Sequence, residues 1–301
     1  MHEKEIITVD EFLASVTVAE PQSHKNLTIL PLMSGKTNDL RLKTLEEALS
    51  EGTIEITEDG GGSVNSLRVA NHGDTPVLLL SGTILKANLQ DRVLRTTFIS
   101  YPHSVVTGEC FCVESDRWRP IRSQEKAVKP DRHLSADIRM NFSKSNQNDI
   151  WSQIEKKRKR MNVQGNTESA DHIYEQYQVD IEEYKKAFTC RPDYAGCIAL
   201  IEGKPIGMDI SGIKEIFHRQ FSDLVSSFVI DALDSAYCEE VRKQKPLTVD
   251  QFLRAVARAK KQTQEALGGT GIKFESGEVV GGALVDHDHN VVVQIEAFAT
   301  Y

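Results

Sequence analysis

The sequence predicts an α+β protein in which a β-rich N-terminal half packs with a helical and β-hairpin C-terminal half. Short alternating apolar segments, separated by turn residues, fill the first 120 positions, which is typical of strands. Apolar residues at three- and four-residue spacing, typical of helices, begin at position 169. The 301 residues are 40% hydrophobic and 27% charged, which excludes a largely disordered chain, a collagen-like fibre and a coiled-coil rod.

Capping boxes and a series of strands organise residues 1–125, the expected β-rich half. Thr8 and Thr44 are each followed three positions later by glutamate, and this pattern predicts that a short helix begins after each threonine. Strands are expected over 27–32, 53–57, 64–69, 77–80, 93–100 and 108–114, with a glycine-rich turn at 58–62.

Residues 126–168 are expected to connect the two halves of one integrated domain. The region from 121 to 170 is polar and predicts a long irregular connection. It contains the basic run Lys156–Arg160, which we interpret as a solvated helix face, with phosphate binding as the alternative.

Residues 169–301 form the expected α+β half. Helical spacing runs from Ile173 to Phe188, and a strand pair turns at 202–204. A long helix is predicted over 213–241, and its apolar stripe is a candidate interface for a homo-oligomer. A capping box at Thr248 predicts a last helix that continues through Leu267, before a hairpin over 279–298.

Charge and composition limit where the protein can be located and which partners it can bind. The net charge of −8 argues against general nucleic-acid binding. Apolar runs stay far below the ~20 residues that a membrane helix needs, and the start of the sequence lacks a signal-peptide pattern. Five dispersed cysteines indicate reduced thiols. We therefore expect a cytoplasmic protein that does not bind a membrane.

The acidic and histidine-rich stretch Asp286–Asn290 is the strongest candidate for a metal loop. A calcium loop needs glycine at its sixth position and glutamate at its twelfth, where Val291 and Ala297 stand. We interpret the stretch as a turn between two strands, and we predict neither a metal nor a cofactor.

The richest polar cluster spans residues 82–118 and lies near expected strand ends, where binding sites gather. Arginine offers a planar fork for phosphate or carboxylate, and tryptophan offers a face on which a base or sugar can stack. A carboxylate can act as a base or hold a ribose hydroxyl. The predicted catalytic residues are Glu114 and Asp116, and the predicted ligand-binding residues are Gln90, Asp91, Arg92, Arg117 and Trp118. The alternative is a structural cluster of ion pairs between these arginines and acids.

Several segments resemble one known family. Gln90-Asp91-Arg92 and, most specifically, the stretch from Cys112 to Trp118 match a pattern of the ADP-ribosylglycohydrolase and rhodanese-phosphatase-superfamily-associated protein domain family. Later segments around 196–207, 226–233 and 281–284 are also similar. The sequence departs from the pattern at 86–88, where a glycine-containing stretch is usual, and this departure puts close backbone approach to a ligand there in doubt.

The resemblance implies a protein that binds or processes an ADP-ribose- or NAD-related nucleotide, in a stress or antiphage system. In that case Gln90, Arg92 and Arg117 hold phosphate or ribose, Trp118 stacks on the base, and Glu114 is the acid/base. The alternative function is a non-catalytic assembly or interaction protein, because no catalytic triad or metal-ligand set is recognised in the sequence. Whether a reaction is catalysed stays open.

Overall fold

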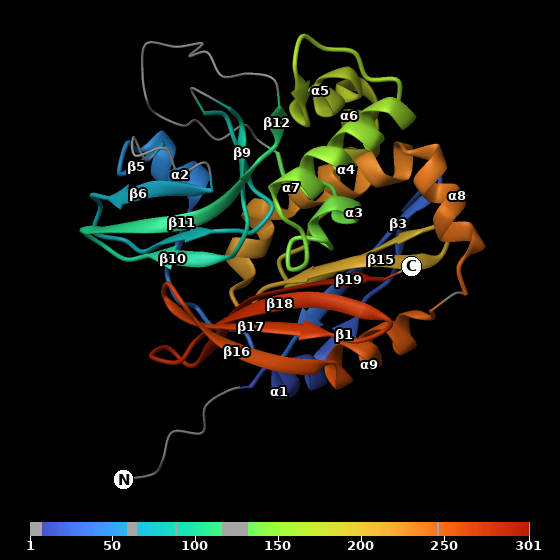
Figure 1. Cartoon of the computed structure of the whole chain (residues 1–301). Helices are drawn as coiled ribbons and strands as arrows, with labels where there is room; N and C mark the ends of the chain where they lie inside the picture. The colour runs from blue at the N-terminus through green and yellow to red at the C-terminus, as the bar shows by residue number, and fades with distance from the viewer. Residues whose placement is uncertain (1–7, 59–64, 88–89, 116–131, 246, 301) are drawn as a thin grey trace. The chain divides into compact units, whose positions relative to one another are not determined.

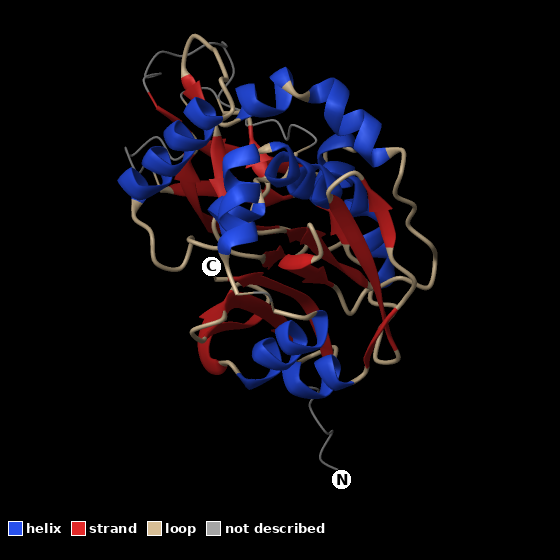
Figure 2. Ribbon diagram, turned by 90° about the vertical axis from the view of Figure 1, so that its right-hand side faces the viewer, coloured by secondary structure: helices blue, strands red, loops and turns tan. Residues whose placement is uncertain are grey.

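The computed structural model describes residues 8–58, 65–87, 90–115, 132–245 and 247–300 (Figure 1). Helices and strands are mixed along the chain, which confirms the predicted α+β class (Figure 2). The chain forms two compact units. Unit 1 contains residues 1–40, 187–221 and 240–301, and unit 2 contains residues 41–186 and 222–239. The expected boundaries at 125 and 168 stay predictions.

A single antiparallel sheet, nine-stranded over the described residues, forms the centre of unit 1. Its strands are, in sheet order, β1 (Val16–Val18), β3 (Leu27–Ser34), β14 (Gly196–Ile201), β15 (Lys204–Ile210), β19 (Val291–Ala299), β18 (Val279–Asp286), β17 (Gly269–Glu275) and β16 (Lys260–Ala266); β2 (Gln22–His24) also pairs with β3. The pairing of Leu32 with Gly196 joins segments that are far apart in the sequence. The predicted hairpins at 196–210 and 279–298 are confirmed.

Two capped helices pack on this sheet, α1 (Val9–Ala14) and α9 (Val249–Arg258). The Thr8 hydroxyl accepts the Glu11 N–H, and the Glu11 carboxylate accepts the Thr8 N–H, as the capping box predicts. Phe12 and Phe252 are fully buried in one core with Ile198 of the sheet. The apolar faces of both helices therefore supply the core of unit 1.

The last helix is shorter than its sequence predicts. It ends at Arg258, and residues up to Leu267 form the edge strand β16 and its turn instead of further helix. The glycines at 268 and 269, which were expected to end the helix, join β16 to β17, and Gly268 has a φ of 83° that glycine adopts without strain.

Over its described residues, unit 2 contains three smaller sheets. The five-stranded sheet has the order β5 (Ile54–Glu58), β6 (Ser66–Asn71), β11 (Ser104–Cys112), β9 (Arg92–Leu94) and β8 (Ile84–Leu85). The others are β10 (Phe98–Ser100), β7 (Val77–Leu79) and β4 (Lys43–Thr44), and the pair β12 (Glu114–Ser115) and β13 (Glu168–Ser169). The expected strands 93–100 and 108–114 are each split into two, and the expected turn at 58–62 lies largely outside the described residues.

Two helices, α3 (Ala136–Arg139) and α4 (Gln147–Arg160), correct the prediction of a long irregular connection over 121–170. Unit 2 also contains α2 (Leu45–Ser50), α5 (Asp171–Gln176) and α6 (Gln178–Lys185). The Asn146 side chain caps α4 by accepting the N–H groups of Asn148 and Asp149. Lys157 and Arg158 are 0% and 3% exposed, so this part of the basic run is not a solvated face.

The expected long helix over 213–241 is divided into α7 (Lys214–Leu233) and α8 (Ser235–Lys243). The Asp234 carboxylate accepts the Tyr237 N–H at 3.2 Å and so caps α8. The apolar stripe proposed as an oligomer interface is buried within the chain: Phe217, Phe221, Leu224, Val225 and Phe228. Among the described residues, no helix is both long and apolar enough to span a membrane.

Candidate functional site

The predicted site residues that the structure describes lie at strand ends in unit 2. Gln90 and Asp91 immediately precede β9, Arg92 begins it, and Glu114 begins β12. All four side chains are buried. The register of β9 and β11 pairs Arg92 with Cys112, and the Val113 N–H donates to the Asp91 carbonyl at 2.9 Å. Asp116, Arg117 and Trp118 lie outside the described residues.

Asp91 and Glu114 are brought together by hydrogen bonds. Glu114 Oε2 accepts the Asp91 N–H at 3.1 Å, and Oε1 accepts the Thr167 hydroxyl at 2.7 Å. Asp91 Oδ2 accepts the Ser169 hydroxyl at 3.2 Å. Strand β13, which pairs with β12, therefore supplies one hydroxyl partner and its neighbour Thr167 supplies the other.

Arg92 is engaged elsewhere. Its Nη2 lies 3.0 Å from Glu58 Oε1, and the two side chains are 4% and 12% exposed. Its Nη1 contacts the Cys112 sulfur. Glu58 on β5 is thus an ion-pair partner of Arg92. The alternative interpretation expected Glu114 or Asp116 in this role, and Asp116 lies outside the described residues.

The two neighbouring thiols stay protonated. Burial raises the pKa of Cys112 to about 11 and that of Cys110 to about 12, and in both the positive charge of Arg92 opposes the shift only partly. A thiolate is the reactive form of cysteine, so neither residue is prepared to act as a nucleophile at neutral pH. All five cysteines are free.

Gln90 differs from its neighbours. Its side chain is 0% exposed, and neither Oε1 nor Nε2 has a hydrogen-bond partner among the described residues. Leaving a buried amide unpaired costs roughly 1–3 kcal/mol, so such groups are rare and call for an explanation.

Three further charged residues, which the sequence did not predict as site residues, join this site. The Asp171 carboxylate, 1% exposed, contacts the ammonium of Lys86 and the guanidinium of Arg132. Lys86 Nζ also lies 3.9 Å from Asp91 Oδ2. Lys86 and Arg132 keep 33% and 21% of their side chains exposed. We call the set Lys86, Gln90, Asp91, Glu114, Arg132, Ser169 and Asp171 the strand-end cluster.

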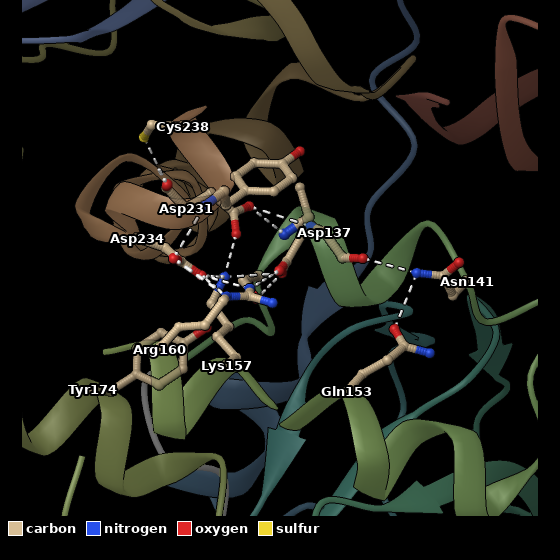
Figure 3. A network of polar contacts seen from close by, with 12 residues as sticks. Asp137, Asn141, Gln153, Lys157, Arg160, Tyr174, Asp231, Asp234 and Cys238 are labelled. Atoms are coloured by element: carbon tan, nitrogen blue, oxygen red, sulfur yellow. Dashed lines mark hydrogen bonds and ion pairs between the residues drawn. The ribbon is translucent and has the colours of Figure 1, made fainter. Parts of the chain in front are cut away.

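A second group of charges lies between helices of unit 2, and Figure 3 shows its side chains pointing toward one another. Lys157 Nζ is fully buried, 2.6 Å from Asp231 Oδ1 and 3.0 Å from Asp137 Oδ1. Arg160 Nε donates to Asp234 Oδ2 at 3.0 Å. Asp231 Oδ2 also accepts the Ala136 N–H at 2.8 Å, at the start of α3. We call Asp137, Lys157, Arg160, Asp231 and Asp234 the helix cluster.

Burial and the neighbouring charges shift the pKa values of the residues in the helix cluster. Burial raises the pKa of Asp231 well above its ordinary value, and the charge of Asp137 acts in the same direction. Burial opposes ionisation of Asp137 too, but Lys157 and hydrogen bonds outweigh it and lower its pKa. Burial disfavours the Lys157 ammonium, but the surrounding aspartates outweigh it and raise its pKa. These shifts favour the protonated form of Asp231 and the ionised form of Asp137.

The helix cluster is structural rather than reactive in this arrangement. Lys157 and Asp231 are inaccessible to solvent, and their contacts tie α3, α4 and α7 together. Lys157 and Asp231 stand 74 positions apart, and no local pattern in the sequence connects them.

The candidate metal loop is a turn, as predicted. Asp286 Oδ1 accepts the His289 N–H at 3.1 Å, and Oδ2 bonds His289 Nδ1 at 2.8 Å, which closes the turn between β18 and β19. Over the part of the chain that the structure describes, no three His, Cys, Asp or Glu side chains converge in a way that could hold a metal ion.

Comparison with known proteins agrees with the resemblance seen in the sequence. The family model of the ARG and Rhodanese-Phosphatase-superfamily-associated Protein domain matches residues 15–298. No curated protein and no solved structure matches the chain. The matched range covers all of unit 2, most of unit 1 and every residue of the two clusters. The chain belongs to the ARG and Rhodanese-Phosphatase-superfamily-associated Protein domain family.

Proposed function

We propose that unit 2 binds an ADP-ribose-type nucleotide at the strand-end cluster, in the cytoplasm and as part of a stress or antiphage system. The family name associates this domain with ARG proteins, and the strand-end cluster carries the groups that such a ligand needs. The observation that carries the proposal is the buried carboxamide of Gln90.

Gln90 offers an acceptor oxygen and two N–H donors that no described residue uses. A bound ligand with both donors and acceptors, such as a ribose or an adenine edge, pairs these groups and removes the penalty of their burial. Buried amides that read a ligand in this way give strong discrimination, because an analogue without the matching groups leaves the amide unpaired.

Lys86 and Arg132 supply positive charge for a diphosphate. Both are partly exposed, and both are held by the buried carboxylate of Asp171, which fixes their position. Arginine binds phosphate oxygens with two parallel hydrogen bonds, and lysine binds them as a point charge. Arg117, in the segment after β12, keeps its predicted phosphate role, and Trp118 keeps its predicted stacking role.

Asp91 and Glu114 are the acceptors for ribose hydroxyls. Glu114 already accepts the Thr167 hydroxyl and Asp91 the Ser169 hydroxyl, so both carboxylates are placed to bind hydroxyl groups, which a ribose presents. If the nucleotide is also processed, Glu114 is the acid/base, with Asp116 as the second candidate. Arg92, bound by Glu58, contributes charge to the site rather than a direct ligand contact.

The proposal is tested by titrating the full chain with ADP-ribose and with NAD in a calorimeter. Gln90→Met keeps the side-chain volume and removes the amide. We expect the affinity for ADP-ribose to fall about tenfold or more, which is ~1.4 kcal/mol, while the free energy of unfolding stays the same or rises. No heat from either nucleotide with the wild-type protein would overturn the proposal.

Gln294→Met is the matched control. Gln294 is a buried glutamine of unit 1 whose amide already donates to Asp209 at 3.3 Å. Its replacement is expected to lower the free energy of unfolding by about 1 kcal/mol and to leave ADP-ribose binding unchanged. Equal loss of binding in both variants would mean that Gln90 has no specific role.

A second titration distinguishes contacts to the phosphates of the ligand from contacts to its adenosine part. Lys86→Met is expected to weaken ADP-ribose binding and to leave adenosine binding unchanged, because adenosine carries no phosphate. Equal weakening of both ligands would argue that Lys86 acts by holding the fold.

One observation favours the alternative function, a non-catalytic assembly protein. Arg92 is already bound by Glu58, and the two side chains are only 4% and 12% exposed, as a structural cluster of ion pairs requires. On this alternative no nucleotide binds, and Gln90→Met changes stability alone. The same calorimetric experiment therefore decides between the two functions.

A further inference from the structure

Helix α5 holds Arg132 of the strand-end cluster with two of its side chains. Asp171, the first residue of the helix, contacts the Arg132 guanidinium with its carboxylate. Tyr174 stands three positions later, so both side chains lie on the same face of the helix. The guanidinium carbon of Arg132 is 5.6 Å from the centroid of the Tyr174 ring. This separation is within the range of a cation–π contact, in which the face of the ring attracts the positive charge.

The Tyr174 hydroxyl also holds the backbone next to Arg132. It donates to the carbonyl of His133 at 2.6 Å, and Tyr174 and His133 are both buried. Burial raises the pKa of Tyr174 well above its ordinary value, so the hydroxyl stays protonated and can donate this hydrogen bond. One tyrosine side chain therefore contacts the Arg132 side chain through its ring and the following residue through its hydroxyl.

The segment that carries Arg132 is also held by other parts of unit 2. The Ile84 N–H of β8 donates to the Arg132 carbonyl at 3.3 Å. Farther along the same segment, the Ala136 N–H donates to Asp231 of the helix cluster at 2.8 Å. Because these hydrogen bonds hold the backbone on both sides of position 133, the freedom that is left to Arg132 is mainly that of its side chain.

We propose that Tyr174 is a positioning residue, which keeps the Arg132 guanidinium in place to bind a phosphate group of the ligand. An arginine side chain has many rotamers, and ordering it during binding lowers the affinity. A guanidinium that is already held by a carboxylate and an aromatic ring avoids most of this loss. The inference rests on the proposed function, because it concerns the phosphate contacts of the same site.

Replacements at two tyrosines separate the contributions of the ring and the hydroxyl. Tyr174→Phe keeps the ring and removes the hydrogen bond to His133. Tyr174→Leu removes both, and so does Tyr174→Met, whose flexible side chain fills irregular space. Tyr177→Leu is the matched control. Tyr177 directly follows α5, and its hydroxyl donates to the Met161 carbonyl at 2.8 Å rather than to the Arg132 segment. Thermal melts show which variants are folded.

The first measurement needs no nucleotide. Phenylglyoxal reacts with accessible guanidinium groups, and mass spectrometry of peptides gives the rate at Arg132 in the full chain. We expect Tyr174→Leu and Tyr174→Met to raise this rate about threefold or more, because the cation–π contact is lost. Tyr174→Phe should keep most of the wild-type protection, and Tyr177→Leu should leave the rate unchanged. A wild-type rate at Arg132 in a folded Leu or Met variant would overturn the proposal.

The second measurement is the affinity for ADP-ribose and for adenosine by calorimetry. We expect Tyr174→Leu to weaken ADP-ribose binding about fivefold and to leave adenosine binding unchanged, because adenosine carries no phosphate. The double variant with Arg132→Met should bind ADP-ribose no more weakly than Arg132→Met alone, because Tyr174 acts through Arg132. Equal weakening of both ligands, or losses that multiply in the double variant, would show a merely structural role and overturn the proposal.

The results distinguish this inference from the proposed function. If the wild-type chain binds ADP-ribose and the Tyr174 variants bind it equally well, the inference alone is wrong. If the wild-type chain binds neither ADP-ribose nor NAD, the proposed function is wrong, and the phosphate role of Arg132 is wrong with it, whatever the phenylglyoxal rates.

Discussion

Unit 1 and unit 2 differ in the kinds of side chains that they bury. The nine-stranded sheet of unit 1 packs through aliphatic and aromatic side chains such as Phe252 and Ile295, whereas the buried lysine and arginine side chains among the described residues all belong to unit 2. Burying charge costs several kcal/mol per ion, and apolar residues of equal volume are often as stabilising. Unit 1 buries carboxylates, at Asp209 and Asp286, but no described lysine or arginine, so the two units differ in buried positive charge.

The largest effect that can test this contrast is expected at Lys157. Lys157→Met removes the ammonium from three buried aspartates, and uncompensated buried charge is expected to lower the free energy of unfolding by about 3–5 kcal/mol. Denaturant titration measures the change. Adding Asp137→Asn to this variant removes one of the stranded carboxylates and should recover part of the loss.

Lys159→Met is the matched control, on the same helix. The Lys159 side chain is 74% exposed, so its replacement is expected to change the free energy of unfolding by less than about 0.5 kcal/mol. If both replacements lowered the free energy of unfolding equally, the helix cluster would contribute no more to stability than an exposed lysine.

A smaller effect is expected in the pH dependence of the same cluster. The folded protein holds a proton on Asp231 at pH values where the unfolded chain, with an ordinary pKa of 3.8, does not. As the pH rises above 4 and passes through the raised pKa, the wild type should lose stability relative to Asp231→Asn, by up to ~1.4 kcal/mol per pH unit. A constant difference between the two proteins would contradict the raised pKa.

The contribution of Asp137 to stability is expected to depend on pH in the opposite direction. Its pKa is lowered in the folded state, so its contribution to stability is present above pH 3.8 and is lost as the pH falls through the folded value. Asp137→Asn should therefore remove stability near neutral pH and leave it unchanged in strong acid. Thermal melts of the wild type and of Asp137→Asn across the acid range measure this difference.

The smallest effect is expected in unit 1. Ile198 is fully buried in β14, and Ile198→Val removes one methylene from an apolar core, which costs about 1 kcal/mol. Because no charge is involved, this difference should be the same at pH 4 and pH 7. If the loss of unfolding free energy in Ile198→Val changed with pH, the expected difference between the two units would be contradicted.

Local signals in the sequence predict much of this fold. Thr8, Thr44 and Thr248 each begin a helix where the capping box places it. The hairpins around 202–204 and 286–290 follow from alternating apolar residues and polar turns. These features depend on contacts within a few residues, which a sequence displays directly.

Features that depend on distant contacts were not predicted. Residues 260–266 contain Lys, Gln, Glu and Ala, which favour helix, and only pairing with β17 makes them a strand. Helix α4 has few apolar residues to mark it, and the burial of Lys157 depends on Asp231, 74 positions away. In the candidate site, Asp91 and Glu114 were predicted, but Lys86, Arg132 and Asp171 resemble any solvated charges until the chain folds.

The most direct test of the proposed function is amide hydrogen exchange of the full chain with and without ADP-ribose. Binding at the strand-end cluster predicts slower exchange at Asp91, Arg92 and Glu114 in unit 2 and unchanged exchange in the sheet of unit 1. Exchange that ADP-ribose leaves unchanged throughout, or slows only in unit 1, would contradict it.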